Sequence, residues 1–323
     1  MSFPTGLQAT RRDLLTHLPA GAALALAGAS ALGGNASAQD ATPATPADQD
    51  LASVAAQLRY VHPEKVYDYL PGLQNETILA AIFGVDVETY RAARQTFADA
   101  VDATATELLA DDAFAAQVDA LPFSPGATVV GIGESDSDDL QSALEILRRV
   151  VALRRPDDGI DILNLAISGQ ATSEAVGRFP ATVLQVEPDW VICGLGGNDT
   201  LRNGAGATKP RVSTEETRLN LAELRHIATA QSNAEFVYLT RWQIDPERIA
   251  AYPVFQEWEI SIRPEDWNAL NEASRQQEGL VIDLEPVFGS PLVAEYLEAD
   301  GLHPTLAGQR EIARTLVAGL ANS

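Results

Sequence analysis

Cysteine is almost absent from this chain of 323 residues, where Cys193 is the only one. A single thiol excludes an internal disulfide, and no cysteine lies near the N-terminus to carry a lipid. Long apolar runs are missing beyond residue 38, so we expect no later segment to insert stably into a membrane. Lysine occurs only at Lys65 and Lys209, and the net charge of −23 argues against nucleic acid as a partner.

The first 38 residues have the layout of an export signal. Paired arginines lie within Thr10–Leu15, an apolar run rich in Ala and Gly covers 20–34, and Ala36–Ala38 offers a cleavage site. The arginine pair resembles the twin-arginine class, although Leu14 stands where that consensus has Phe. A membrane anchor is the weaker interpretation because the run is short. We therefore expect residues 1–38 to be removed and the mature protein to be periplasmic or extracellular.

Two segments, a linker and a helical extension, lie between the predicted signal and residue 125. Residues 39–50 are rich in Pro, Ala and Thr, which predicts a flexible linker. Over 51–124 apolar residues recur at spacings of three and four, which predicts a helical extension. A lid, a dimerisation surface and added packing are its possible roles, and we favour a cap packed on the following domain because its apolar stripes need burial. The residues near its start that could line a pocket, although packing is favoured, are Tyr60, His62, Tyr67 and Tyr69.

From residue 125 to 323, strand-like runs alternate with helical stretches. The runs occupy 128–132, 161–167, 190–195, 235–240 and 280–284. This alternation predicts an α/β fold with a parallel five-stranded sheet and crossover helices. Ligands of such sheets bind at the carboxyl ends of the strands, so the loops that follow the strands are where functional residues are expected.

The segment VVGIGESDSDD at 129–139 places two serines among four carboxylates directly after the first strand. One interpretation is a solvated helix start, because Ser and Asp cap helices and favour the positive end of the helix dipole. The other is a nucleophile at a strand-to-helix turn, with Ser135 as the candidate and Ser137 as the N-cap of the next helix. A nucleophilic serine also needs a base, a group that orients the base and donors for the oxyanion.

Few histidines are available as that base. His62, His226 and His303 remain beyond the signal, and His226 lies in a helical stretch. His303 follows Asp300 by three residues in a loop bounded by Gly and Pro, a spacing that lets the carboxylate fix the imidazole tautomer. Taken alone, this pair is more simply interpreted as a loop with a helix cap.

Glycine-bearing turns after the second and third strands favour the catalytic interpretation of Asp300 and His303 over the helix cap. They offer a backbone N–H at Gly169 and a side-chain amide at Asn198. Four short blocks then follow one another at strand ends: Gly133–Asp136, Asn164–Gly169, Gly196–Asp199 and Asp300–Pro304. Through these four blocks the chain resembles the SGNH or GDSL hydrolases.

The resemblance implies a fold and a set of roles. The fold is a flavodoxin-like three-layer α/β/α sandwich, and no cofactor is implied. Ser135 would be the nucleophile, His303 the general base and then acid, and Asp300 the group that orients it. The N–H groups of Ser135 and Gly169 and the side chain of Asn198 would form the oxyanion hole.

Two residues beside the serine depart from the family pattern. Glu134 stands where the family has Asp, and Asp136 stands where it has an apolar residue. Together with Asp138 and Asp139 they predict an acidic collar around the nucleophile that disfavours anionic substrates. A metal site is the weaker interpretation because the acidic run lacks partner ligands. The elbow of α/β-hydrolases does not fit, since Ser137 stands where that turn needs Gly.

An exported serine esterase or acyl hydrolase that cleaves carboxylic esters is the function these observations favour. Small acyl esters, acetylated carbohydrates and lysolipids stay open as substrates, so a carbohydrate O-deacetylase and a lysophospholipase are alternatives. Trp242 and Gln243 after the fourth strand could equally line a pocket or belong to core and rim. A binding domain that kept the fold without turnover is the second class of hypothesis, and the complete set of catalytic and oxyanion residues argues against it.

Overall fold

Five parallel strands form the central sheet of the computed structural model, which describes residues 54–323. The strands are β1 (Thr128–Gly133), β2 (Asp161–Asn164), β3 (Trp190–Gly194), β5 (Glu235–Leu239) and β7 (Leu280–Ile282), in the order β2-β1-β3-β5-β7. The parallel five-stranded sheet predicted from the sequence is confirmed, and each strand starts where the pattern placed it. The predicted signal and linker lie outside the described residues.

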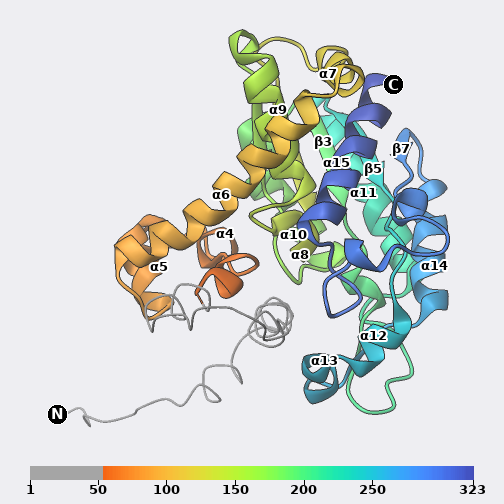
Figure 1. Cartoon of the computed structure of the whole chain (residues 1–323). Helices are drawn as coiled ribbons and strands as arrows, with labels where there is room; N and C mark the ends of the chain where they lie inside the picture. The colour runs from red at the N-terminus through yellow and green to blue at the C-terminus, as the bar shows by residue number, and fades with distance from the viewer. Residues whose placement is uncertain (1–53) are drawn as a thin grey trace.

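Helices cover both faces of the sheet and make three layers (Figure 1). Alternation along β1 directs Val129 to one face and Val130 to the other, and the other strands repeat this pattern. One face packs on α9 (Ala143–Arg154) and α15 (Leu306–Ala321), and the opposite face packs on α10 (Thr172–Thr182) and α11 (Thr214–Ser232). The three-layer α/β/α prediction is therefore confirmed.

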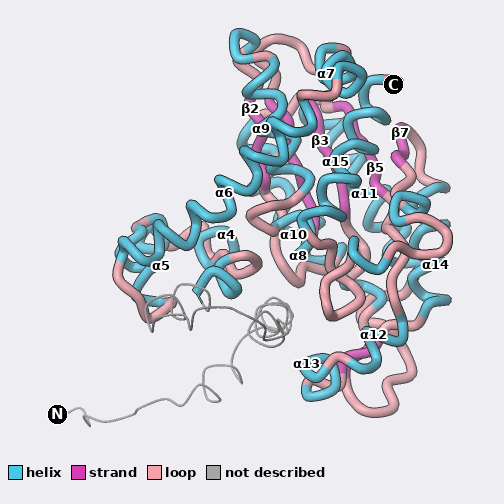
Figure 2. Tube along the Cα trace, viewed as in Figure 1, coloured by secondary structure: helices cyan, strands magenta, loops and turns pink. Residues whose placement is uncertain are grey.

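The chain before the sheet is helical, as predicted, and packs in two parts. Residues 54–58 are helical, and α4 (Pro63–Val66), α5 (Glu76–Ile82), α6 (Val87–Leu109) and α7 (Asp112–Asp119) follow. The first half of α6 packs with α5 in a local cluster that includes Leu79 and Tyr90. Its second half and α7 contribute Leu108 and Phe114 to the same core as α9 and α15. Figure 2 shows α5 standing away from the sheet while α6 runs back to it.

A small lobe at the carboxyl ends of the strands was not predicted. A two-stranded antiparallel pair, β4 (Arg202–Asn203) with β6 (Ile260–Ser261), lies beside α12 (Pro246–Ala251), α13 (Pro253–Glu257) and α14 (Pro264–Arg275). Its apolar cluster includes Phe255, Trp267 and Leu302. Because Leu302 is the neighbour of His303, this lobe supports the loop that carries the candidate base.

The turn after β1 differs from its prediction. Ser135–Asp138 forms a one-turn helix, α8, and the long helix α9 starts only at Ala143. Ser142, whose hydroxyl accepts a hydrogen bond from the N–H of Glu145, is the N-cap of α9, so the prediction of Ser137 as that cap is wrong. Ser137 instead packs against β1, where a Cβ on Gly133 would lie 2.3 Å from its hydroxyl. Glycine at 133 is therefore what lets α8 fold back on the strand.

Six single-turn 3-10 helices complete the described chain. They are η1 (Pro71–Gln74), η2 (Pro156–Asp158), η3 (Leu184–Val186), η4 (Asn198–Thr200), η5 (Glu285–Phe288) and η6 (Ala294–Tyr296). No helix in residues 54–323 combines the length and the apolar character that a bilayer span requires.

Candidate active site

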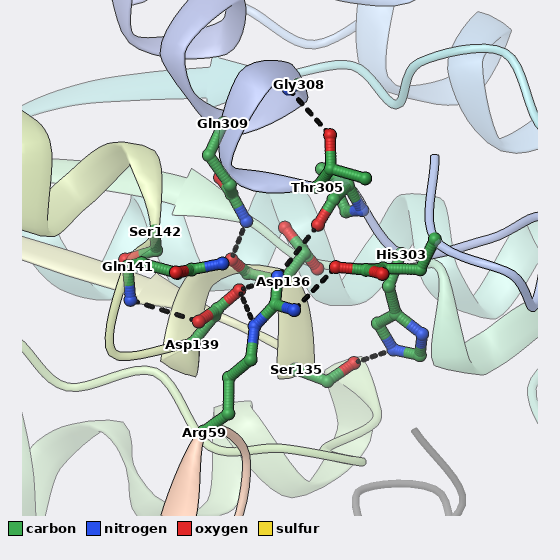
Figure 3. A network of polar contacts seen from close by, with 12 residues as sticks. Arg59, Ser135, Asp136, Asp139, Gln141, Ser142, His303, Thr305, Gly308 and Gln309 are labelled. Carbon is green, nitrogen blue, oxygen red and sulfur yellow. Dashed lines mark hydrogen bonds and ion pairs between the residues drawn. The ribbon is translucent and has the colours of Figure 1, made fainter. Parts of the chain in front are cut away.

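Ser135, His303 and Asp300 form a continuous chain of hydrogen bonds. The Ser135 hydroxyl lies 2.8 Å from Nε2 of His303, and Nδ1 of His303 lies 2.6 Å from an Asp300 carboxylate oxygen. The other oxygen of Asp300 accepts the backbone N–H groups of Leu302 and His303 at 2.8 and 3.0 Å. Figure 3 shows the imidazole turned toward the serine. The structure thus brings Ser135 together with His303, which lies 168 positions further along the chain.

A tight turn positions the histidine beside its carboxylate. Gly301 has a φ of 73°, a conformation that L side chains rarely adopt, and a Cβ there would lie 2.7 Å from the carbonyl oxygen of Asp245. The glycine lets the chain reverse between Asp300 and His303. The carboxylate can then contact both the ring and the backbone of the same loop.

Charge and burial oppose each other at this pair. Burial lowers the pKa of His303, but the charge and hydrogen bond of Asp300 outweigh it and leave the pKa above its ordinary value. Burial raises the pKa of Asp300, and the bonds from His303 and from the two N–H groups lower it further than burial raises it. Asp300 is therefore held as a carboxylate that favours protonation of the imidazole.

The predicted oxyanion residues lie in two adjoining cavities. Ser135, Asn198 and His303 line a small cavity of about 10 Å³, enough for one water molecule. Gly169 lines a neighbouring cavity together with Gln170, whose carbonyl accepts a hydrogen bond from the Asn198 amide at 3.3 Å. Within residues 54–323 no acceptor is bonded to the N–H of Ser135 or of Gly169. These two donors are thus available to a ligand.

Glu134 ties the serine turn to the asparagine loop. Its carboxylate oxygens accept the backbone N–H groups of Gly196 and Asn198 at 2.5 and 2.9 Å. Burial raises the pKa of Glu134 to about 8, against the opposing charge of Arg241. The side chain is long enough to span from the end of β1 to the loop after β3. This contact holds Asn198 beside Ser135.

Comparison with known proteins agrees with this geometry. A profile of the GDSL-like lipase/acylhydrolase family matches residues 128–311. The esterase TesA of Pseudomonas aeruginosa is 31% identical over 188 residues, which cover 56% of this chain and 82% of that esterase. This chain belongs to the GDSL-like lipase/acylhydrolase family. It is an ester-cleaving hydrolase, and the resemblance drawn from the four sequence blocks is confirmed.

Two solved structures are similar to part of this hydrolase. A GDSL-like lipase candidate from Parabacteroides merdae superposes with a TM-score of 0.50 at 16% identity, covering 62% of this chain and 99% of that one. An acetyl xylan esterase from Geobacillus stearothermophilus gives a TM-score of 0.47 at 17% identity, covering 61% and 96%. The family profile starts at residue 128, so the helical extension lies outside it.

The four carboxylates around Ser135 do not form an acidic collar. All four are buried, and three of them carry cationic partners. Asp136 pairs with Arg241 at 2.5 Å, Asp138 with His62 at 2.7 Å and Lys65 at 2.6 Å, and Asp139 with Arg59 at 2.8 Å. The predicted repulsion of anionic substrates is therefore wrong in its premise, because the charges are compensated inside the protein. The solvated helix start is wrong as well, since these residues do not face water.

Sequence reasoning missed these partners of the carboxylates. Arg59, His62 and Lys65 come from the N-terminal extension, and Arg241 follows β5. A buried acidic run requires cations nearby, so their existence could have been inferred. Their identity could not, because the pairs are 73 to 105 positions apart.

A large cavity of about 870 Å³ is lined by Tyr60 and Gly169, among other residues. The N-terminal segment and α10 form its walls, and all four pocket candidates from the sequence line it: Tyr60, His62, Tyr67 and Tyr69. The ring of Tyr60 also lies 5.3 Å from the imidazole of His303, and its buried hydroxyl has no partner among the described residues. Trp242 lines the small cavity and donates its indole N–H to the carbonyl of Leu302. Both interpretations of these aromatic residues, pocket and packing, thus apply.

No set of three or more His, Cys, Asp or Glu side chains is arranged for metal binding in the described part of the hydrolase.

Proposed function

We propose that this hydrolase is a serine esterase with Ser135, His303 and Asp300 as its catalytic triad. The hydrogen-bonded chain from Ser135 through His303 to Asp300 carries the proposal. His303 takes the hydroxyl proton as Ser135 attacks the ester carbonyl, and then gives that proton to the departing alcohol. Water, deprotonated by His303, then attacks the acyl-serine ester, His303 returns the proton to the departing Ser135 oxygen, and the carboxylic acid leaves. Asp300 stabilises the imidazolium that forms in each step.

The oxyanion of each tetrahedral intermediate would be stabilised by three donors. They are the backbone N–H groups of Ser135 and Gly169 and the side-chain amide of Asn198. The two N–H groups are free of other acceptors among the described residues, and Glu134 holds the loop of Asn198 in place. Loss of one such donor lowers kcat by about 100- to 1000-fold in well-studied cases.

Covalent trapping tests the nucleophile. A fluorophosphonate probe should label wild-type protein at Ser135, and Ser135→Ala should lose both labelling and hydrolysis of p-nitrophenyl acetate while keeping its thermal unfolding transition. Ser137→Ala is the matched control, since its hydroxyl bonds only to Asp136, and it should keep both activities. Labelling at Ser137 would identify that residue as the nucleophile in place of Ser135. Wild-type protein that shows neither labelling nor turnover would favour a non-catalytic binding domain.

The size of the second cavity supports esters with a bulky acyl or alcohol part. A volume of about 870 Å³ beside Gly169 has room for a chain or a sugar ring. Ala181 is an exposed wall residue of this cavity, so Ala181→Trp should fill space without disturbing the core. We expect kcat/KM to fall for p-nitrophenyl decanoate and to stay near the wild-type value for p-nitrophenyl acetate. Ala113→Trp on α7, away from the cavity, is the control, and equal effects on both esters would contradict the assignment.

Export by the twin-arginine route is the localisation we propose. The arginine pair, the short apolar run and the small-residue cleavage site of residues 1–38 support it. Replacing Arg11 and Arg12 by Lys should retain the protein in the cytoplasm, as measured by cell fractionation.

A further inference from the structure

Arg59 lies between the two loops that carry the proposed nucleophile and base. It comes from the N-terminal extension, outside the segment matched by the family profile. Its guanidinium contacts Asp139, at the end of the turn that starts with Ser135, at 2.8 Å. The same group bonds to the Glu298 carboxylate at 2.5 Å and to the carbonyl of Pro304 at 3.0 Å. Glu298 and Pro304 flank Asp300 and His303 on either side.

These contacts use the shape of arginine and not its charge alone. Three different nitrogens of one planar group bond to two carboxylates and one carbonyl, a geometry that an ammonium cannot reproduce. The Arg59 and Asp139 side chains are 4% and 0% exposed, so removal of either one leaves the other buried without its counter-charge. Figure 3 shows the Arg59 side chain reaching Asp139 beside the Ser135–His303 pair.

The backbone of Arg59 and the side chain of Tyr60 add contacts to the same two loops. The carbonyl of Arg59 accepts the N–H of Leu140, and the ring of Tyr60 packs at 5.3 Å from the imidazole of His303. The extension therefore contacts the serine side and the histidine side of the site within two consecutive residues. Nothing else in the described chain joins Asp139 directly to the loop of His303.

We infer that Arg59 is a positioning residue for catalysis, which fixes the loop after Ser135 against the loop of His303. The inference rests on the proposed triad. Its premise is geometric: the Ser135–His303 hydrogen bond spans two loops whose relative position the clamp by Arg59 determines. Small displacements of reacting groups are costly, and a shift of about 1 Å can lower a rate on the order of 100-fold.

The test compares Arg59→Met, Arg59→Lys and the control Arg91→Gln, which removes an exposed ion pair with Glu76 in the same extension. We expect Arg59→Met to lower kcat by about 10- to 100-fold with little change in KM, because substrate contacts remain while alignment is lost. Arg59→Lys should have a higher kcat than Arg59→Met, because lysine keeps the positive charge but lacks the planar guanidinium group. Arg91→Gln should match wild type.

The pH profile supplies a readout that a merely structural role would not move. His303 faces Asp300 and Asp136, which raise its pKa, and Arg59, which lowers it, while Tyr60 and Ser135 are its uncharged neighbours. Loss of the Arg59 charge therefore raises the pKa of His303. Since His303 must be neutral to act as a base, the acidic limb of the kcat/KM profile should move to higher pH in Arg59→Met and not in Arg59→Lys.

A second variant separates alignment from folding. Arg59→Met leaves Asp139 buried without its cation, which could lower stability enough to obscure the kinetics. Arg59→Met combined with Asp139→Asn removes both charges and keeps an oxygen for the N–H of Gln141. We expect this double variant to recover thermal stability but not kcat. Recovery of kcat together with stability, or an unchanged kcat and pH profile in both variants, would overturn the inference, whereas an inactive wild-type protein would instead refute the proposed function.

Discussion

The bond between Asp300 and His303 links the electrostatics of the site to its pH dependence. The pKa of His303 is above its ordinary value of about 6.5 because the effect of Asp300 exceeds that of burial. We expect kcat/KM for a neutral ester to fall as the pH drops through that raised pKa, because the imidazolium cannot accept the serine proton.

The variant Asp300→Asn tests whether Asp300 raises the pKa of His303, because it predicts the direction in which the pH profile moves. Without the carboxylate, burial dominates and lowers the pKa of His303, so the acidic limb should move to lower pH. The amide also favours the wrong tautomer, and kcat should fall by about 10,000-fold. The measurement is a kcat/KM profile between pH 5 and 9. A limb that stays in place in Asp300→Asn would show that another group controls the profile.

Sequence reasoning at the scale of single residues succeeded where the signal is local. Asp300 and His303 are three residues apart, and their contact follows from a glycine turn that the sequence displays. The prediction for Asp136, Asp138 and Asp139 failed because their surroundings are not local. Their charged side chains predicted exposure to solvent, whereas partners from distant elements allow them to be buried.

At the scale of elements, α6 belongs to two packing units. Leu108, near its end, is fully buried in the core shared with α9 and α15, whereas α5 packs on its start and leaves Ile82 52% exposed. We expect Leu108→Ala to lower the free energy of unfolding by about 2–5 kcal/mol. Ile82→Ala should change it by no more than about 0.5 kcal/mol. Urea denaturation of both variants checks the difference, and equal effects would contradict the assignment of the larger stabilising role to the buried Leu108.

Some element boundaries follow from residue type alone, and others depend on tertiary contacts. The strands β1 and β5 were predicted nearly to the residue, since their apolar runs end at glycine or polar positions. The start of α9 was not, because Ser137 and Ser142 are equally good caps by residue type. The close approach of Ser137 to Gly133 excludes it from that role and leaves Ser142 as the cap.

At the scale of the molecule, the parallel sheet brings the site together. The carboxyl ends of β1 and β3 lie side by side, since Gly133 pairs with Gly194 in the sheet register. That places the turn of Ser135 next to the loop of Asn198, and Glu134 bridges them. The N-terminal extension places Tyr60 against His303 and supplies one wall of the large cavity.

The sequence by itself determined the five strands of the parallel sheet, the family and the candidate residues in the loops at the strand ends. Periodicity, turn residues and short spacings are local properties, and the carboxyl ends of parallel strands all lie at the same edge of a sheet. Only the tertiary structure decided which cations neutralise the buried carboxylates and what the extension contacts. Arg59 and Asp139 are 80 positions apart, and Asp136 and Arg241 are 105 apart. Pairs so distant carry no spacing signal, and many of the chain's 22 basic side chains could satisfy the same charge, so their choice follows from how the packed elements meet.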